Sequence, residues 1–248
     1  MTTKAIGIDI GGTGIKGAVV NVSTGELLTD RKKLATPDGG APEDILSTVL
    51  ELFDELGDIS PEMPVGVCFP AVIIRGKTMS AANVSAQWIG LEAEKLFEKK
   101  LGRDIHFIND ADAAGVAEAR YGAAKGTSGL TILTTLGTGI GSAMLFNGEL
   151  IPNSELGHLE LDGHDAETRA STSAKKDEDL SWEDWADRLQ HYYEYLEALF
   201  SPDLFIVGGG ISKNADEFLP LLTLRTPIKP AVLRNNAGIV GAAALAVQ

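Results

Sequence analysis

Two glycine-rich segments of this chain carry residue types that can hold phosphate. The tetrapeptide Gly-Thr-Gly-Ile occurs at residues 12–15 and again at 137–140, and each copy lies between two apolar runs. This pattern predicts two hairpins in which a tight glycine turn joins two strands. Backbone amides in such loops can cup phosphate oxygens, so we expect two related halves that hold a phosphate donor from both sides.

Two other interpretations of these loops stay open from the residues alone. Residues 12–17 also fit the G-x-G-x-x-G pattern of a dinucleotide-binding loop, but that loop must open a helix, whereas residues 18–22 have the β-branched character of a strand. Two ligand-free turns are the other alternative. That alternative explains neither the threonine in both loops nor the Asp9 and Lys16 that flank the first loop.

Asp110 is the candidate base for a phosphoryl transfer. This reaction needs in-line positioning, charge stabilisation on the moving group, and a carboxylate that accepts the proton of the attacking hydroxyl. Asp110 follows the strand predicted over 105–108, beside Asn109. It could instead cap the helix predicted over 111–121. Asp112 is interpreted as a charge in the first turn of that helix.

The elements that must position these residues follow from hydrophobic periodicity. Strands are expected in the hairpin over 4–22 and over 27–34, 65–72, 105–108 and 204–207, and helices over 43–56, 91–100, 111–121, 182–200 and 237–247. Residues 160–181 are polar and predict a surface helix and loop. The apolar stripe of residues 182–200 is expected to face the core. The order of these elements indicates α/β layers.

Composition disfavours several classes of function. The net charge of the 248-residue chain is -14, which disfavours nucleic acid or an anionic membrane as a partner. No apolar run approaches the roughly 20 residues of a membrane span, and no signal peptide is expected. The single cysteine, Cys68, excludes an internal disulfide and a cysteine-cluster zinc site. It indicates a cytoplasmic protein, and its apolar neighbours predict a buried thiol.

Five motifs occur in an order that resembles one known family. They are Asp9 to Lys16, Asn109-Asp110, Leu136 to Gly141, Glu155-Leu-Gly-His158 and Val207 to Ser212. Together they resemble the ROK sugar kinases, of the superfamily that also contains actin and the chaperone ATPases. The resemblance implies an α/β, two-domain, duplicated actin-like ATPase (ribonuclease H-like) fold with a central cleft. The expected domains are 1–108 plus 235–248 and 109–234.

Within that family the chain is similar to the polyphosphate glucokinase branch. Residues 159–171 lack the cysteines that form a zinc motif in most ROK members, so no zinc is expected. Residues 80–88, 109–115, 152–155 and 234–241 carry the similarity to the branch. It implies phosphoryl transfer from inorganic polyphosphate, and in many members also from ATP, to the 6-hydroxyl of glucose, in a homodimer. A strictly ATP-dependent ROK glucokinase or glucomannokinase is the alternative. A sugar-responsive ROK repressor is disfavoured, because only three residues precede the first strand and the chain is acidic.

The resemblance assigns a role to individual residues. Asp110 becomes the base for the sugar 6-hydroxyl, and Asp9 is expected to hold Mg²⁺ through water. The expected sugar contacts are Asn83, Asn109, Asp110, Gly137, Glu155, His158 and Glu167. The expected phosphate contacts are Gly11, Gly12, Thr13, Gly14, Lys16, Gly137, Thr138, Gly139, Gly209 and Gly210. Asn83 could equally be a turn residue, and His158 a surface or capping residue. Candidates for a basic track along the donor are Lys16, Lys213, Arg225, Lys229 and Arg234.

Overall fold

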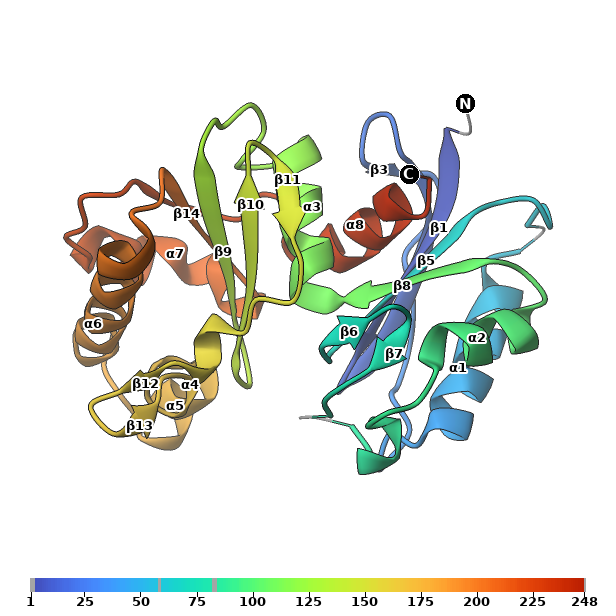
Figure 1. The fold of residues 1–248 in the computed structure, drawn as a ribbon, viewed down its shortest axis with the longest axis horizontal. Helices are drawn as coiled ribbons and strands as arrows, with labels where there is room; N and C mark the ends of the chain where they lie inside the picture. The colour runs from blue at the N-terminus through green and yellow to red at the C-terminus, as the bar shows by residue number, and fades with distance from the viewer. Residues whose placement is uncertain (1–2, 58, 82–83, 248) are drawn as a thin grey trace. The chain divides into compact units, whose positions relative to one another are not determined.

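The chain divides into two compact units, each built around one β-sheet (Figure 1). The computed structural model describes residues 3–57, 59–81 and 84–247. The first unit contains residues 1–117 and 236–248, and the second contains residues 118–235. The division therefore falls within helix α3 (Asp110–Tyr121). Within the described part of the chain, every helix is too short or too polar to span a lipid bilayer.

The sheet of the first unit begins with the predicted hairpin. Its strand order is β3-β2-β1-β5-β8, with β4 also paired to β2. The strands are β1 (Lys4–Gly11), β2 (Gly14–Asn21), β3 (Glu26–Leu27), β4 (Lys32–Leu34), β5 (Val65–Phe69) and β8 (Ile105–Asn109). β1 and β2 are antiparallel, whereas β1, β5 and β8 run parallel. The carboxyl ends of these three strands therefore lie at one edge of the sheet, which gathers the residues that follow them.

The prediction of a single strand over 27–34 was wrong. The chain stops pairing with β2 after β3 and pairs with it again only at β4. The Val19 amide donates to Thr29 Oγ1 (3.1 Å) instead of to a strand carbonyl. This side-chain acceptor ends β3 after two residues. The chain rejoins β2 at Lys32, and the short strand β4 then lies directly beside the first glycine loop.

Two helices cover opposite faces of the first sheet (Figure 1). α1 (Pro42–Glu55) buries the predicted apolar face of Ile45, Val49 and Leu52 against β2 and β4. α8 (Ala237–Leu245) packs so closely on β1 and β5 that a Cβ on Gly7 or Gly66 would overlap its backbone. The remaining elements of the unit are β6 (Ile73–Ile74), β7 (Lys77–Thr78), η1 (Ala86–Trp88) and α2 (Ala93–Leu101).

The second unit repeats the hairpin-plus-parallel-strand arrangement. Its sheet order is β11-β10-β9-β14-β15. The strands are β9 (Leu130–Leu136), β10 (Ile140–Phe146), β11 (Glu149–Ile151), β14 (Leu204–Gly208) and β15 (Ile228–Pro230). β9 pairs antiparallel with β10 and parallel with β14, as β1 does with β2 and β5. The two glycine loops thus occupy equivalent turns in two related sheets.

Helix α6 (Trp182–Phe200) provides the main apolar support of the second sheet. The predicted core-facing stripe is confirmed, because Trp185, Leu189, Tyr192, Tyr193 and Leu196 are fully buried. Leu199, at the C-terminal end of the stripe, is exposed.

The segment predicted as a surface helix and loop over 160–181 is more ordered than expected. It forms the hairpin β12 (Glu160–Leu161) and β13 (His164–Asp165), then α4 (Glu167–Ala170) and α5 (Thr172–Asp177). Ala166, Ala170 and Ala174, spaced four apart, are buried. Their small size gave no hydrophobic signal within a polar sequence. The other short elements of the unit are η2 (Leu156–His158), η3 (Gly210–Asn214), α7 (Ala215–Phe218), η4 (Leu219–Leu221) and η5 (Arg234–Asn236).

Candidate active site

The first glycine loop carries a lysine–aspartate pair at its base. Asp9 on β1 and Lys16 on β2 are directly opposite in the strand register. Lys16 Nζ lies 2.8 Å from Asp9 Oδ2, and the two side chains are 25% and 16% exposed. The turn itself is open to solvent at Gly12 and Thr13. The structure thus brings together Asp9 and the predicted phosphate contacts Gly11, Gly12, Thr13, Gly14 and Lys16.

Cys68 and helix α8 pack against the Asp9 carboxylate. Cys68 Sγ lies 3.7 Å from Asp9 Oδ1, and the predicted burial of this thiol is confirmed. Burial first, and then the nearby carboxylates of Asp9 and Asp110, raise the pKa of Cys68 well above its ordinary value. The side chain therefore stays a neutral thiol that can donate to Asp9. A Cβ on Gly238 would lie 3.1 Å from both Asp9 Cγ and Cys68 Sγ, so a side chain there would require these two groups to move by a few tenths of an ångström.

Asn109, at the end of β8, caps helix α3. Its Oδ1 accepts bonds from the amides of Ala111 (2.8 Å) and Asp112 (3.0 Å), while its Nδ2 donates to Ala71 O (3.0 Å). The alternative in which Asp110 is the helix cap therefore gives way to a cap at Asn109. The half-buried Asp110 begins the helix, and its Oδ1 lies 2.8 Å from the Ala111 amide. Asp112 is in the first turn as expected, but it is fully buried.

A pocket of about 330 Å³ lies beside the first loop, within the first unit. Its lining residues are Gly12, Thr36, Pro37, Asp38, Gly39, Gly40 and Val84. Thr36 Oγ1 donates to Gly11 O (2.5 Å), and Trp88 Nε1 donates to Gly40 O (2.8 Å), so both ends of the segment are fixed. Its volume is that of a site for a small molecule. Of these residues Gly12 was predicted as a phosphate contact, whereas sequence reasoning missed residues 36–40, although Thr-Pro-Asp-Gly-Gly is a strong turn signal. Asn83 lies outside the described residues.

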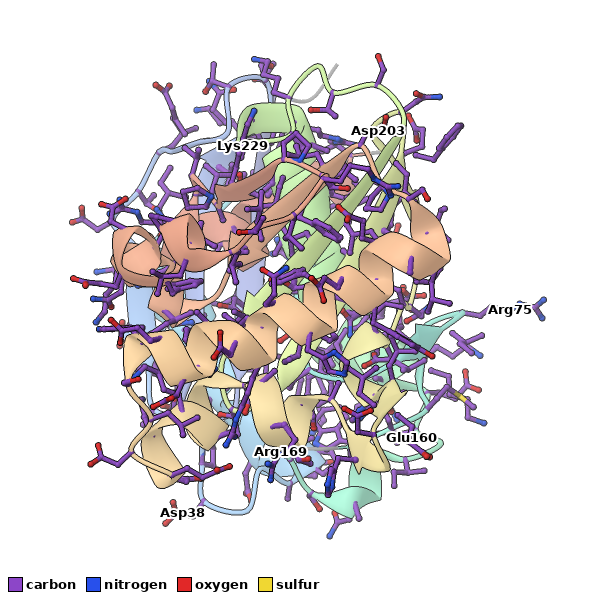
Figure 2. The ribbon with its side chains drawn as sticks, turned by 90° about the vertical axis from the view of Figure 1, so that its left-hand side faces the viewer. Asp38, Arg75, Glu160, Arg169, Asp203 and Lys229 are labelled. Carbon is purple, nitrogen blue, oxygen red and sulfur yellow. The ribbon has the colours of Figure 1, made fainter. Side chains whose placement is uncertain are left out.

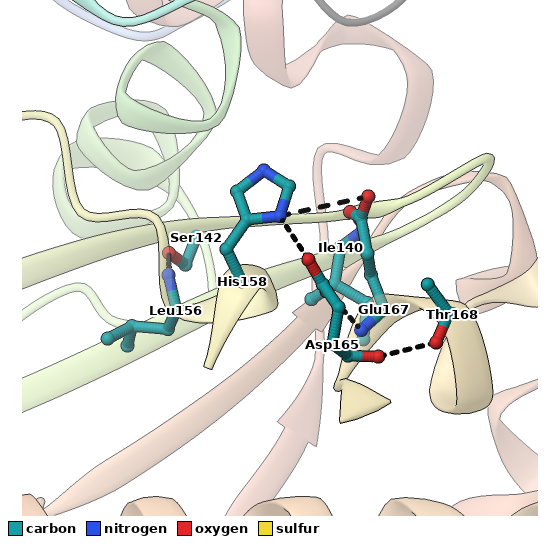
Figure 3. Close-up of polar contacts among 7 residues, drawn as sticks. All are labelled: Ile140, Ser142, Leu156, His158, Asp165, Glu167 and Thr168. Atoms are coloured by element: carbon teal, nitrogen blue, oxygen red, sulfur yellow. Dashed lines mark hydrogen bonds and ion pairs between the residues drawn. The ribbon is translucent and has the colours of Figure 1, made fainter. Parts of the chain in front are cut away.

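In the second unit, the predicted sugar-binding residues His158 and Glu167 meet at an unpredicted aspartate. His158 Nδ1 lies 2.9 Å from Asp165 Oδ2 and 3.9 Å from Glu167 Oε1 (Figure 3). Since a carboxylate only accepts, we assign the proton of the neutral imidazole to Nδ1, which leaves Nε2 as an acceptor. Asp165 Oδ1 also accepts the Glu167 amide (3.2 Å). Asp165 therefore fixes both neighbours.

The charges of this cluster shift two pKa values. The hydrogen bond to Asp165 raises the pKa of His158, against partial desolvation, and Glu167 and Glu155 add to the rise. Burial raises the pKa of Glu155, which the nearby His158 partly offsets. Glu155 immediately precedes the 3₁₀ turn that carries His158. Carboxylates and an imidazole grouped in this way can hydrogen-bond several hydroxyls of a sugar and reject analogues that lack one.

Glu167 also connects this cluster to the second glycine loop. Its Oε2 accepts the Ile140 amide (2.9 Å), and a Cβ on Gly139 would overlap this oxygen. The loop is further held by the bond from the Ser173 amide to Gly137 O (3.1 Å). Thr138 stays exposed at the tip. One carboxylate thus supports the loop with one oxygen and approaches His158 with the other (Figure 3).

Gly209 places a third glycine segment against the same loop. Its φ of 81° lies in the left-handed region, and a Cβ there would overlap the backbone of Leu136. The predicted phosphate contacts Gly209 and Gly210 are therefore neighbours of the strand that leads into Gly137–Gly139.

One group of residues and one separate carboxylate offer ligands for a metal ion. Among the described residues, His158, Asp165 and Glu167 form a group whose ligand atoms all lie within 4.8 Å of one another. Asp9 offers a carboxylate beside the first glycine loop, where a hard cation such as Mg²⁺ would be bound through oxygen and water. The absence of zinc stays a prediction, as does the role of Asp9.

Most candidates for the basic track lie on exposed parts of the second unit. Lys229 is on the edge strand β15 (Figure 2), and Lys213 is in η3. Arg225 Nη2 donates to Glu197 O and Ser201 Oγ (both 3.4 Å). Their role toward a donor stays a prediction.

Comparisons with known proteins agree with the motifs. Residues 5–176 match the sequence profile of the ROK family. The chain is 48% identical over 242 residues to a polyphosphate glucokinase of Mycobacterium tuberculosis. The aligned region covers 97% of this chain and 90% of that protein. It is 54% identical to the inorganic polyphosphate/ATP-glucomannokinase of Arthrobacter sp. strain KM, with a TM-score of 0.96 over 99% of each chain.

A more distant structure agrees in fold. A ROK family glucokinase from Streptomyces griseus, solved with glucose and AMPPNP, is 24% identical with a TM-score of 0.82 over 99% of each chain. At this identity the likeness supports the fold alone. The predicted α/β fold of the actin-like ATPases is confirmed by these neighbours. The chain belongs to the ROK family.

Proposed function

We propose that this protein transfers a phosphoryl group from inorganic polyphosphate to the 6-hydroxyl of glucose, with ATP as a second candidate donor. The observation that carries the proposal is the near full-length similarity to two proteins named for this chemistry. The chain's own residues support it, because Lys16 and Asp9 lie together beside a glycine loop in the first unit, and the carboxylates of Asp9 and Asp110 both raise the pKa of the same buried thiol, Cys68. A second glycine loop in the other unit is joined to a cluster that can bind hydroxyls.

Asp110 is the base in this proposal. The oxygen of the 6-hydroxyl attacks the terminal phosphorus of the donor, and its proton passes to Asp110. The bond from that phosphorus to the bridging oxygen breaks. The products are glucose 6-phosphate and a donor shorter by one phosphate, which keeps the electron pair of the broken bond. A positioned base typically contributes about 10² to 10⁴ in rate.

The sugar contacts are Asn83, Asn109, Gly137, Glu155, His158 and Glu167. His158, held by Asp165, presents Nε2 as an acceptor for one hydroxyl, and Glu155 and Glu167 supply carboxylate oxygens. Asn109 contacts the sugar while it also caps α3. Both its side-chain polar atoms already have partners in the protein, so each would share a second hydrogen bond with the sugar.

The donor contacts are the two glycine loops, Lys16, Thr13 and Thr138. Lys16 balances charge on the phosphates, and its pairing with Asp9 holds its amine at the base of the loop. Asp9 fits a Mg²⁺ site because its carboxylate lies beside the loop with a thiol and a lysine fixing its orientation. A bound divalent ion would neutralise charge on the phosphates and orient them for transfer.

The test is a matrix of donors and acceptors with the purified protein and magnesium. Initial rates of sugar 6-phosphate formation are compared for polyphosphate of defined length and for ATP, each with glucose and with mannose. Mannose is included because the Arthrobacter relative is named a glucomannokinase. Turnover of glucose with polyphosphate supports the proposal. Turnover with ATP alone favours the strictly ATP-dependent alternative, and no turnover with either donor contradicts both.

We also propose the wider setting expected from the sequence. The enzyme has two domains, 1–108 plus 235–248 and 109–234, the protein works in the cytoplasm, and it forms a homodimer that uses Mg²⁺ and no zinc. Metal analysis after purification without chelators tests the expected metal content. Sedimentation of the untagged protein tests the homodimer.

A further inference from the structure

A row of charged side chains crosses the first sheet next to the glycine loop. The strand register places Asp9 opposite Lys16, and Lys16 opposite Lys33 on β4. Residues directly opposite in antiparallel strands project from the same face of the sheet. The row therefore consists of Asp9, Lys16 and Lys33, on the face of the sheet that α8 covers.

Lys33 lies against the loop itself. A Cβ on Gly14 would be 2.6 Å from Lys33 Cε and 3.6 Å from Lys33 Nζ. The lysine side chain thus runs diagonally from β4 across Gly14, the last residue of the phosphate loop. Glycine at this position leaves the space that the lysine stem occupies.

The charges of this row do not balance. Asp9 forms its ion pair with Lys16 at 2.8 Å, and among the described residues no carboxylate forms an ion pair with Lys33, which is exposed. Like charges directly opposite in a sheet are destabilising. The row therefore has one positive charge in excess, and it lies beside the open backbone amides of the loop. A bound anion would stabilise such an arrangement.

We propose that Lys33 is a second phosphate-binding lysine, which contacts a chain of condensed phosphates held at the first glycine loop. The proposal rests on the proposed function for the identity of that donor, and it adds a residue from outside the loop motif. The same contact could serve the tail of inorganic polyphosphate or the phosphates of ATP. The two sources share their chemistry and are separated by the experiment.

Lys32 provides a matched control on the same strand. It is opposite Gly17, on the other face of the sheet, where the side chain of Leu52 from α1 would lie 2.9 Å from a Cβ on Gly17. Lys32→Gln and Lys33→Gln therefore remove the same charge from adjacent residues, but only the second change is on the face of the loop.

The experiment measures steady-state kinetics and donor binding for the wild type, Lys33→Gln, Lys33→Arg and Lys32→Gln. We expect Lys33→Gln to raise the donor KM by ~3- to 30-fold, the range of one partly exposed charged hydrogen bond. The kcat and the glucose KM should change less than about twofold, and the dependence of donor KM on salt should weaken. Lys33→Arg should stay within about threefold of the wild type, and Lys32→Gln should match it.

Each outcome decides the proposal. A rise confined to polyphosphate assigns Lys33 to the polyphosphate tail, and a rise with both donors assigns it to phosphates that the two donors share. An unchanged donor KM in Lys33→Gln, an equal rise in Lys32→Gln, or a lower kcat with an unchanged KM overturns the proposal. If the wild type turns over neither donor, the proposed function fails, and calorimetric titration with polyphosphate alone then tests Lys33. Equal affinity of wild type and Lys33→Gln would overturn the contact.

Discussion

Glu167 has two separable contacts, and replacing it by alanine or by glutamine should have different effects on the two substrates. Its Oε2 accepts the Ile140 amide at 2.9 Å, and its Oε1 approaches His158. Alanine removes both contacts. Glutamine keeps a carbonyl oxygen that can accept the Ile140 amide, but it removes the negative charge.

The size of the effect follows from the bond to Ile140. A hydrogen bond to a charged group contributes about 1.5–3 kcal/mol, and the Glu167 side chain is 28% exposed, so we take about 1–2 kcal/mol. At about 1.4 kcal/mol per factor of ten, Glu167→Ala should raise the donor KM by about 5- to 30-fold. Glu167→Gln should change the donor KM by less than about threefold, because the acceptor remains. Both variants should raise the glucose KM by about tenfold or more, since a hydroxyl partner is lost.

The assay is a two-substrate kinetic analysis, with each variant checked for its melting temperature. Glu160→Ala, which removes an exposed carboxylate from β12, is the control and should behave as the wild type (Figure 2). If alanine and glutamine raise the donor KM equally, the bond to Ile140 does not support the loop. If neither variant changes the glucose KM, Glu167 does not face the sugar.

Three further predictions follow from the described contacts. Asp110→Asn should lower kcat by about 10² to 10⁴ while the glucose dissociation constant changes little, and wild-type turnover would remove Asp110 from catalysis. Asp165→Asn should destabilise the fold by less than about 1 kcal/mol, and only at low pH. The raised pKa of folded His158 gives stability that is complete below the unfolded pKa and is lost as pH rises through the folded pKa; equal melting-temperature differences at pH 5.5 and 9 would contradict this. Gly238→Ala should shift the Asp9 carboxylate by a few tenths of an ångström and raise the magnesium concentration needed for half-maximal rate. A magnesium titration that matches the wild type would refute that packing argument.

The hairpins and long helices could be predicted because their signals are local. Glycine punctuation between apolar runs gave both β-turns, and the 3.6-residue period gave α1 and α6. β4 could not be separated from β3, because three residues of strand leave no period and the break depends on Thr29 reaching Val19. Predictions from local pattern are weakest where a tertiary contact decides the element.

The candidate site residues could be named from their motifs, whereas the contacts that support them could not be predicted. The sequence contains Asp165 seven residues after His158, but their contact exists only because the β12–β13 hairpin folds the chain back. The same holds for Lys33, whose position beside the loop depends on β4 rejoining β2. A polar side chain that acts on another residue leaves no periodic signal, so its partner has to be seen in three dimensions.

The first unit is completed by α8, which comes from the far end of the chain. During synthesis, β1 and β5 leave the ribosome long before the helix that lies on Gly7 and Gly66. The intervening residues 118–235 take about 6 to 24 s to translate at about 5–20 residues per second. The second unit is continuous in sequence and is made entirely within that interval, while the sheet bearing Asp9 still lacks one face. The residues of the His158–Asp165–Glu167 cluster are therefore all synthesised before the helix that packs against Asp9, so this carboxylate, although near the N-terminus, gains its final support late.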